Sequence, residues 1–456
     1  MSAEARTGAA EFARYGRDAM FFGRLFFGGH GGRTGGGRPR SRWRMELLCV
    51  AALGGLVLAM LIPWGCTPTD MGQAIPLEGR VLRVRLLQGV EQVSISASQP
   101  PLYFTSSDAT QRYLDLPRGA NVPVTFGNGA FRAAGTILPR GELTIQPTAS
   151  GSVAINGVAY RGRFRLVPTG PLRFDVINDV DVDEYLMGVI SRELFPGWHE
   201  QTYRAQAIAA RTYALYEKHV PREPRHWDVY ADQRSQVYGG VPAETAKSRE
   251  AVEATRGIVL AYGPPGGEKL FKAYFSSCCG GVTQAVCDAF PGEPFIPPLS
   301  AQKVGPLCSA SPRFNWGPVV IMKDELTRRL RAWGAARNRP EKDIGLVHSV
   351  EIAARNAHGR PVRYTVTDAR GLRYSMACED FRWAVNYSAA DGNTLSSSYV
   401  ESVINESDRI RFVGGHGHGH GVGMCQWCAE ARARAGVLAE DILMYAYPGA
   451  VLVRAY

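Results

Sequence analysis

The sequence predicts an α+β protein with a β-rich N-terminal part, a helical core and a smaller inserted α+β subdomain, after a single N-terminal membrane segment. Three observations predict this. Short apolar runs separated by Gly, Pro, Ser and Asn fill residues 81–180. A helix, a break and a second helix follow at 181–218, and an uncharged apolar run lies at 47–62. The 456 residues, 45% of them hydrophobic, allow a large core.

The N-terminal region is basic and then apolar. Residues 1–44 hold nine arginines against three acidic residues, so they carry +6 of the net charge of +10. A basic tail alone is compatible with nucleic-acid binding, but the sixteen uncharged residues of Leu47–Ile62 follow it directly and argue against that class. We expect a disordered cytoplasmic tail at 1–45, a signal anchor at 46–65, and the remainder outside the cytoplasm. Cleavage with secretion, and translation from Met45, stay open.

After a linker at 66–80, we expect one folded region at 81–456. Its parts are a β-rich segment at 81–180, a core from 181–299 and 401–456, and a subdomain at 300–400 of unassigned role. The expected strands of the β-rich segment are Val81–Leu87, Val93–Ala97, Leu102–Phe104, Val122–Phe126, Leu143–Gln146, Val153–Ile155, Tyr160–Leu166 and Leu172–Val176. Later helices are expected at Ala246–Arg256, Lys323–Trp333, Cys378–Asn386 and Cys425–Ala435.

The helix pair is the best-defined local feature. The first helix is expected over Asp183–Leu194, because Asp181 and Glu184 have the spacing of a capping box and Pro196 forces a stop. The second is expected over His199–Lys218. These two helices therefore form a hairpin with a short connection.

One acidic residue of the first helix lies in an unusual place. Leu186, Val189 and Ile190 mark an apolar stripe, and the next position of that stripe is Glu193. Burial and the negative end of the helix dipole would both raise the pKa of this carboxyl group. The alternative is a glutamate fixed by an arginine such as Arg192 or Arg211.

The second helix carries many alanines, which allow close packing, and Arg211 among them. A buried arginine needs a carboxylate or a polar or anionic ligand. Glu193 on the neighbouring helix is the expected candidate.

The residues of this hairpin closely resemble the signature of the stage II sporulation protein D family, whose relatives include the amidase-enhancer proteins. The matching runs are Glu184–Leu186, Gly188–Ile190, Glu193, Trp198 and Ala205–Leu215. Further matches are Trp227–Tyr230, Gln236–Gly240, Phe271–Thr283, Cys308–Trp316 and Gly414–Ala429. Some members carry a Cys/His cluster, similar to a zinc site, between the first two of these further matches. Here Ala231–Ser235 stands in that place, so the cluster is absent.

The last matching block is rich in glycine. Alternate glycines expose backbone N–H groups, and the following helix adds its positive end, which suits sugar hydroxyls or an oxyanion. No strand–turn–helix unit of the dinucleotide-binding type surrounds it. The block resembles the family's Gly-His-Gly-x-Gly-Met-Ser-Gln signature, with Cys425 in place of the serine, whereas His420 and Gln426 match. A zinc site built from the loop histidines and Cys425 and Cys428 stays open; histidines that only donate and accept hydrogen bonds are the alternative.

Seven cysteines lie in the folded region: Cys278, Cys279, Cys287, Cys308, Cys378, Cys425 and Cys428. Outside the cytoplasm they allow up to three disulfides. One hypothesis pairs the Cys278/Cys279 turn with the Cys425/Cys428 loop and so ties two site-forming segments together.

The resemblance implies a lytic transglycosylase that cleaves the MurNAc–GlcNAc bond of peptide-stripped peptidoglycan strands and leaves 1,6-anhydro ends. This reaction uses one carboxyl group twice, first as acid and then as base, whereas ordinary glycosidases need two. Glu193 is the expected catalytic residue. The expected substrate-binding residues are Arg211, Tyr213, Ser276, His420 and Gln426. No cofactor or catalytic metal is expected.

Two other functions stay open. One is a glycan-binding module that stimulates a separate cell-wall amidase, as the amidase-enhancer relatives imply. The other is a metal-dependent hydrolase built on the His/Cys loop. The expected location is the cell envelope, with a single-pass anchor in the cytoplasmic membrane and the C-terminal domain outside.

Overall fold

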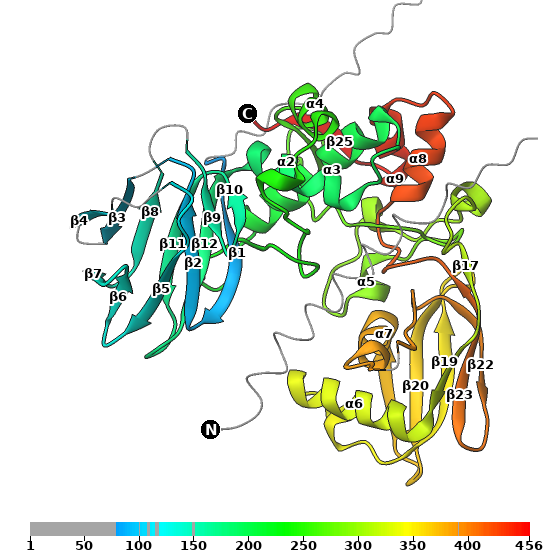
Figure 1. The fold of residues 1–456 in the computed structure, drawn as a ribbon. Coiled ribbons are helices and arrows are strands. Elements are labelled where there is room, and N and C mark those ends of the chain that lie inside the picture. The colour runs from blue at the N-terminus through cyan, green and yellow to red at the C-terminus, as the bar shows by residue number, and fades with distance from the viewer. Residues whose placement is uncertain (1–78, 100, 107–109, 115–117, 148–150, 391) are drawn as a thin grey trace, which may run out of the picture. The chain divides into compact units, whose positions relative to one another are not determined.

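The computed structural model describes residues 79–456 except 100, 107–109, 115–117, 148–150 and 391. The predicted tail, the signal anchor at 46–65 and nearly all of the linker lie outside the described residues. Within the described part of the chain, no helix combines the length and apolar character needed to cross a membrane. The predicted α+β class is confirmed, because a long run of strands precedes the helices in the described residues and most strand pairs are antiparallel (Figure 1).

The β-rich segment forms two packed sheets. The first has the order β13-β1-β12-β11-β8-β3-β4 and the second β10-β9-β2-β5-β6-β7. Phe131 of the second sheet meets Phe174 of the first edge to face, with ring centroids 5.2 Å apart, within a core drawn from both sheets. The strands are β1 (Val81–Val90), β2 (Gln92–Ala97), β3 (Leu102–Ser106), β4 (Gln111–Leu114), β5 (Val122–Gly127), β6 (Ala130–Ala133), β7 (Thr136–Arg140), β8 (Leu143–Gln146), β9 (Val153–Ile155), β10 (Val158–Tyr160), β11 (Arg163–Pro168), β12 (Phe174–Asp181) and β13 (Val229–Tyr230).

Two expected strands of this segment differ from the structure. The expected strand Tyr160–Leu166 is in fact the end of β10 and the start of β11, which belong to different sheets. Gly162 between them has φ +79°, and a Cβ there would lie 2.3 Å from the Asp179 carbonyl oxygen, so the chain turns where only glycine fits. The last strand starts at Phe174 rather than Leu172 and continues to Asp181, which brings it directly to the first helix.

The helix pair follows the last strand without a loop. It consists of α2 (Val182–Glu193) and α3 (Glu200–His219), within a residue or so of the expected bounds. The Asp181 side chain caps α2 by accepting from the Asp183 N–H at 2.9 Å. The pair packs with η3 (Val241–Ala243), α4 (Ala246–Ala254) and a three-stranded sheet of β15 (Lys269–Leu270), β14 (Ile258–Tyr262) and β25 (Val451–Arg454).

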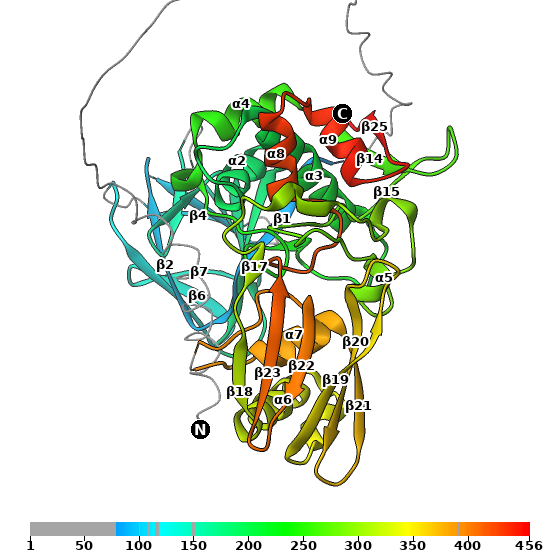
Figure 2. The ribbon, with the colours of Figure 1, turned by 90° about the vertical axis from the view of Figure 1, so that its right-hand side faces the viewer.

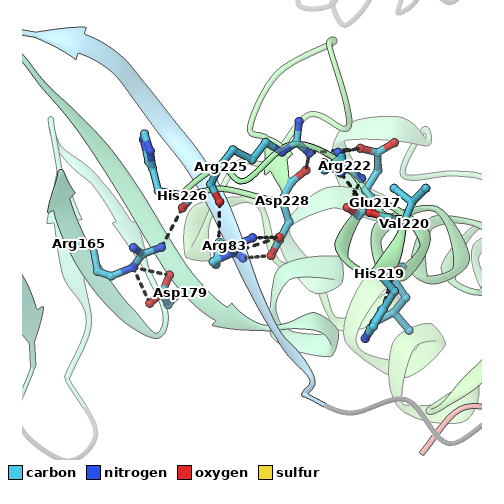
Figure 3. Close-up of polar contacts among 11 residues, drawn as sticks. Arg83, Arg165, Asp179, Glu217, His219, Val220, Arg222, Arg225, His226 and Asp228 are labelled. Atoms are coloured by element: carbon cyan, nitrogen blue, oxygen red, sulfur yellow. Dashed lines mark hydrogen bonds and ion pairs between the residues drawn. The ribbon is translucent and has the colours of Figure 1, made fainter. Parts of the chain in front are cut away.

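The segment between α3 and β13 is fixed to the first sheet by arginines (Figure 3). Arg83 of β1 donates to the nearly inaccessible carboxylate of Asp228, with an ion-pair distance of 2.6 Å, and to the Arg225 carbonyl at 3.0 Å. Arg165 of β11 donates to the His226 carbonyl at 2.9 Å. These bonds set the start of β13, which pairs in parallel with β1, and therefore the path of residues 231–240 that follow.

The subdomain consists of two sheets with two longer helices (Figure 2). β23 lies between β18 and β22, and β20 lies between β19 and β21. Because β22 and β23 complete the first of these sheets, the subdomain continues past residue 400 to about His416. Its elements are β17 (Asn315–Trp316), β18 (Val319–Met322), α6 (Lys323–Arg337), η6 (Pro340–Asp343), β19 (Val347–Arg355), β20 (Pro361–Asp368), β21 (Arg373–Ala377), α7 (Cys378–Asn386), β22 (Val400–Asn405) and β23 (Arg409–His416).

Two distant segments pair at the junction with the core. β16 (Phe275–Ser276) runs parallel to β24 (Met424–Cys425), and the chain then enters α8 (Gln426–Arg434) and α9 (Ala439–Ala446). Short helices α5 (Val286–Ala289), η4 (Pro297–Leu299) and η5 (Gly305–Cys308) follow β16. A single cluster of buried side chains runs from α3 through these elements into the subdomain.

Candidate functional site

Glu193 is the last residue of α2, at the end of its buried face. Leu186, Val189 and Ile190 are fully buried, and the glutamate side chain that follows them on the same stripe is half-buried. Leu194 leaves the helix in an extended conformation two residues before Pro196. The structure thus places the carboxyl group where the apolar stripe predicts it.

The partners of Glu193 are neutral hydrogen-bond donors. The backbone N–H of Val237 donates to Oε1 at 3.3 Å, and the side chain of Gln426 donates a second hydrogen bond. Burial raises the pKa of Glu193, and these two bonds lower it by a smaller amount. Among the described residues no arginine or lysine forms an ion pair with Glu193, so the arginine-fixed alternative is wrong. This carboxyl group keeps its proton to a higher pH than an ordinary glutamate.

A glycine on α2 allows the strap 236–240 to reach Glu193. A Cβ on Gly188 would lie 2.8 Å from a ring carbon of Tyr238 and 2.9 Å from the Gly240 carbonyl oxygen. The Gly239 N–H instead donates to the Gly188 carbonyl at 3.1 Å. The strap can therefore lie directly on the helix, which brings the Val237 N–H within reach of the carboxylate.

Arg211 is placed differently from the expectation. Its guanidinium is completely buried and pairs with Asp183 at the start of α2, at 2.9 Å, not with Glu193. It also donates to Thr255 and to the carbonyls of Val252 and Ile258. Arg211 thus has a carboxylate partner, as expected, but that partner is Asp183. The predicted role of Arg211 in substrate binding is not supported, because its guanidinium has no exposed surface and four protein partners. Arg211 is a structural residue here.

Gln426 reaches Glu193 because of the β16–β24 pairing. As the first residue of α8, it follows Cys425 of β24 directly, and its side chain also contacts Gln206 of α3 at 3.5 Å. Ser276 of β16 is buried, and its Oγ accepts from the Gly421 N–H at 3.2 Å. Ser276 therefore holds the glycine loop, while Gln426 contacts the carboxyl group.

His420 and Tyr213 line the surroundings of this pairing. The Nδ1 atom of His420 accepts from the Val422 N–H at 3.0 Å, and its ring lies against Tyr274, with centroids 5.7 Å apart. Burial lowers the pKa of His420 to about 4, so the ring is neutral at neutral pH. Tyr213 is buried against Phe275 of β16 with centroids 6.4 Å apart, and burial raises its pKa. Both rings thus border β16 as neutral groups.

The loop histidines do not converge on the cysteines. His416 bonds Asn315 at 2.7 Å and Glu401 at 2.8 Å, whereas His418 is exposed. The metal site expected as an alternative, with histidines and cysteines together, is therefore not formed.

The family model described as stage II sporulation protein (SpoIID) matches residues 172–262, which hold β12, the helix pair, Glu193 and the strap. The predicted resemblance to the stage II sporulation protein D family is thereby confirmed over this segment.

Relatives extend the similarity beyond that segment. The chain is 28% identical over 308 residues to an uncharacterized protein of Brachyspira hyodysenteriae, covering 66% of this chain and 73% of that one. It is 26% identical over 299 residues to the amidase enhancer of Bacillus subtilis, covering 59% of this chain and 40% of that protein. An uncharacterized protein of Chlamydia pneumoniae is 29% identical over 120 residues, which are 26% of this chain and 44% of that one.

An aromatic group beside Glu193 was missed by the sequence analysis. Phe195, two residues after Glu193, is 47% exposed and lies 5.3 Å from Trp198 and 6.0 Å from Trp427, between ring centroids. Trp198 and Trp427 are 5.0 Å apart. Phe195 lies two residues after Glu193, Trp427 directly follows Gln426, and Trp198 is part of the family signature. These positions in the sequence were the available signal.

Proposed function

We propose that this protein is a peptidoglycan lytic transglycosylase with Glu193 as its acid and base. The observation that carries the proposal is the half-buried carboxyl group of Glu193, whose partners are two neutral donors and whose pKa is raised by burial. A cell-wall role fits the family and the amidase-enhancer relative. The proposal of lytic transglycosylase activity, in contrast to a general cell-wall role, depends on the chemistry of the Glu193 carboxyl group.

The reaction uses a single carboxyl group in two steps. Protonated Glu193 gives its proton to the glycosidic oxygen as the C1–O bond breaks, and positive charge develops on the sugar ring. The resulting carboxylate then accepts the proton of the C6 hydroxyl, whose oxygen forms the new bond to C1. Glu193 is therefore protonated again at the end of the cycle, and no water is consumed.

The neutral partners suit this cycle. The donors on Val237 and Gln426 stabilise the carboxylate form after the first step, while the absence of a cation in contact with Glu193 among the described residues leaves the protonated form accessible before it. An arginine in that place would hold the group ionised. Phe195, which is exposed, and the partly buried Trp427 add aromatic surface next to the acid, on which a sugar ring can lie.

The product distinguishes this activity from its alternatives. We expect purified full-length protein, incubated with peptidoglycan stripped of peptides by an amidase, to release fragments that each carry a 1,6-anhydro end and are one water lighter than hydrolysis products. Mass spectrometry of the fragments checks this. Hydrolysed ends, or no release at all, would contradict the proposal.

A second function is favoured by one comparison. The relative named amidase enhancer suggests that the chain binds glycan and stimulates a separate cell-wall amidase. In that case the protein would pellet with peptidoglycan and raise the rate of an added amidase, but release no anhydro ends. A Glu193→Gln variant would then stimulate the amidase as well as the unchanged chain does.

We also propose that the activity lies in the cell envelope, because the glycan substrate is there. Residues 46–65 would anchor the chain once in the cytoplasmic membrane with the described domain outside. A phosphatase fused after residue 456 should be active in cells, and an inactive fusion would contradict this orientation.

A further inference from the structure

Four cysteines from three separate segments meet in the interior, and we call them the four-cysteine cluster: Cys279, Cys308, Cys425 and Cys428. All are buried, and their Sγ atoms lie within 4.8 Å of one another. We propose that the four-cysteine cluster is a tetrahedral site for a structural Zn²⁺ ion. This proposal is independent of the reaction at Glu193.

The sulfur spacing fits zinc. A Zn–S bond of about 2.3 Å places the sulfurs of a regular tetrahedron about 3.8 Å apart. The Sγ of Cys279 is 3.6 Å from that of Cys308 and 3.8 Å from that of Cys428. A cluster of several irons would need more room between its ligands. The sulfurs therefore surround a space suited to one ion.

The same distances distinguish this site from the disulfides that the sequence suggested. A disulfide bond is about 2.05 Å long, and all seven described cysteines are free. The structure does bring the Cys278/Cys279 turn to the Cys425/Cys428 loop, as that hypothesis required. It adds Cys308 from a third segment, which gives four sulfurs a common centre instead of separate pairs.

Contacts within the protein already hold the four cysteines in place. Cys425 and Cys428 have C-x₂-C spacing at the start of α8, which is common at zinc sites. The Cys279 N–H donates to the Cys425 Sγ at 3.3 Å, a contact that stabilises a thiolate. Gly280 allows the turn to approach the loop, because a Cβ there would lie 2.7 Å from the Gly417 nitrogen.

A buried arginine lies beside the four-cysteine cluster. Arg360 has no exposed surface and donates to the carbonyls of Cys279 at 3.1 Å, Val282 at 2.8 Å and His420 at 3.0 Å. Within the described ranges it forms no ion pair, although a buried guanidinium is costly without an opposite charge. Zn²⁺ with four thiolates carries a net charge of −2, and one of its ligands is bonded to Arg360 through the backbone. The proposed ion site therefore provides the missing counter-charge.

The proposed ion would be structural. All four positions are taken by protein sulfurs, so none is open to water or substrate. Gln426 and Trp427 lie between two of the ligands in sequence. The ion would thereby fix the start of α8, and with it the group that bonds Glu193.

Metal analysis of the full-length protein tests the proposal. We expect one zinc per chain by elemental analysis, and a native mass that exceeds the unfolded mass by one zinc less the displaced protons. Growth with Co²⁺ should give the visible absorption bands of tetrahedral cobalt–thiolate. A metal-free chain, a mass lower by four hydrogens as two disulfides would give, or iron in place of zinc would each overturn it.

Two variants locate the site. Cys308→Ser should lose the bound zinc, whereas Cys378→Ser, at a buried cysteine that bonds the Asp288 carbonyl outside the cluster, should keep one equivalent. If Cys308→Ser does not fold, the metal content and cobalt spectrum of the unchanged chain still decide. Loss of zinc from Cys378→Ser and retention by Cys308→Ser would contradict the ligand set.

Discussion

The two ends of helix α2 carry two acidic residues in opposite electrostatic surroundings. At its start, Asp183 meets the buried guanidinium of Arg211 at 2.9 Å, with Arg80 and Arg256 within 3.8 Å and the Tyr456 hydroxyl at 2.9 Å. At its end, the partners of Glu193 among the described residues are neutral donors. One carboxylate is neutralised by cations, and the other, half-buried, has no cation in contact within the described ranges.

This difference separates a structural acid from a chemical one. A carboxylate paired with a buried arginine stays ionised, because either charge alone would be expensive in the interior. A carboxyl group desolvated without a cation has its two protonation states closer in free energy at neutral pH, so it can release and recover a proton. Substitutions made at one end of the helix at a time can therefore test whether the two acidic residues differ in this way.

The largest effect is expected on activity at the Glu193 end. Glu193→Gln keeps the shape and the neutral state but removes the proton, so release of anhydro ends should fall by about 10²–10⁴-fold, while the melting temperature stays the same or rises. Rates of product release and thermal unfolding check this. Glu253→Gln, the same change at an exposed glutamate of α4, should alter neither. Undiminished release from Glu193→Gln would remove Glu193 from the mechanism.

The next effect is expected on stability at the Asp183 end. Asp183→Asn leaves the buried charge of Arg211 without a counter-charge, which should reduce the free energy of unfolding by about 3–5 kcal/mol. Urea unfolding of the two chains measures it. Asp441→Asn, at an exposed aspartate in the first turn of α9, should change the free energy by less than about 0.5 kcal/mol. Equal stabilities would mean that the Arg211 pair is not a determinant of the fold.

The third effect concerns the hydrogen bond between Gln426 and Glu193. This bond favours the ionised carboxylate, and a hydrogen bond to a charged group contributes about 1.5–3 kcal/mol, so Gln426→Leu should raise the pKa of Glu193 further. The alkaline limb of the pH–rate profile of kcat/KM should move to higher pH. Gln302→Leu, at a partly buried glutamine that contacts the Ala446 carbonyl instead, should leave the profile in place. A shift to lower pH would contradict the assigned bond.

The sequence alone predicts part of this arrangement. The hairpin and the position of Glu193 follow from local signals, the stripe at Leu186, Val189 and Ile190 and the stop at Pro196. The predicted partner of Arg211, Glu193, was wrong because of the relative direction of the two helices. Helices joined by a short connection run antiparallel, so Arg211, about 16 Å into α3, lies level with Asp183, about 15 Å back along α2.

Contacts between distant segments were harder to predict. The parallel pairing of β16 with β24, which brings Gln426 to Glu193, joins residues about 150 positions apart. The four-cysteine cluster needs Cys308 from a third segment, and no local pattern connects it with the C-x₂-C pair. The break at Gly162 was missed because alternating apolar residues continue on both sides of it.

The smallest effect is the pH dependence of stability that Glu193 itself contributes. Its pKa is raised in the folded state above the 4.5 of an ordinary glutamate, so the folded chain binds the proton more tightly than the unfolded chain. This contribution is fully present below pH 4.5 and is lost as the pH rises through the folded-state pKa, by about 1.4 kcal/mol for each pH unit that separates the folded and unfolded pKa values. Subtracting the unfolding free energy of Glu193→Gln from that of the unchanged chain at each pH isolates it. The difference should decrease with rising pH, whereas an increase would mean that a cation near Glu193 holds it ionised.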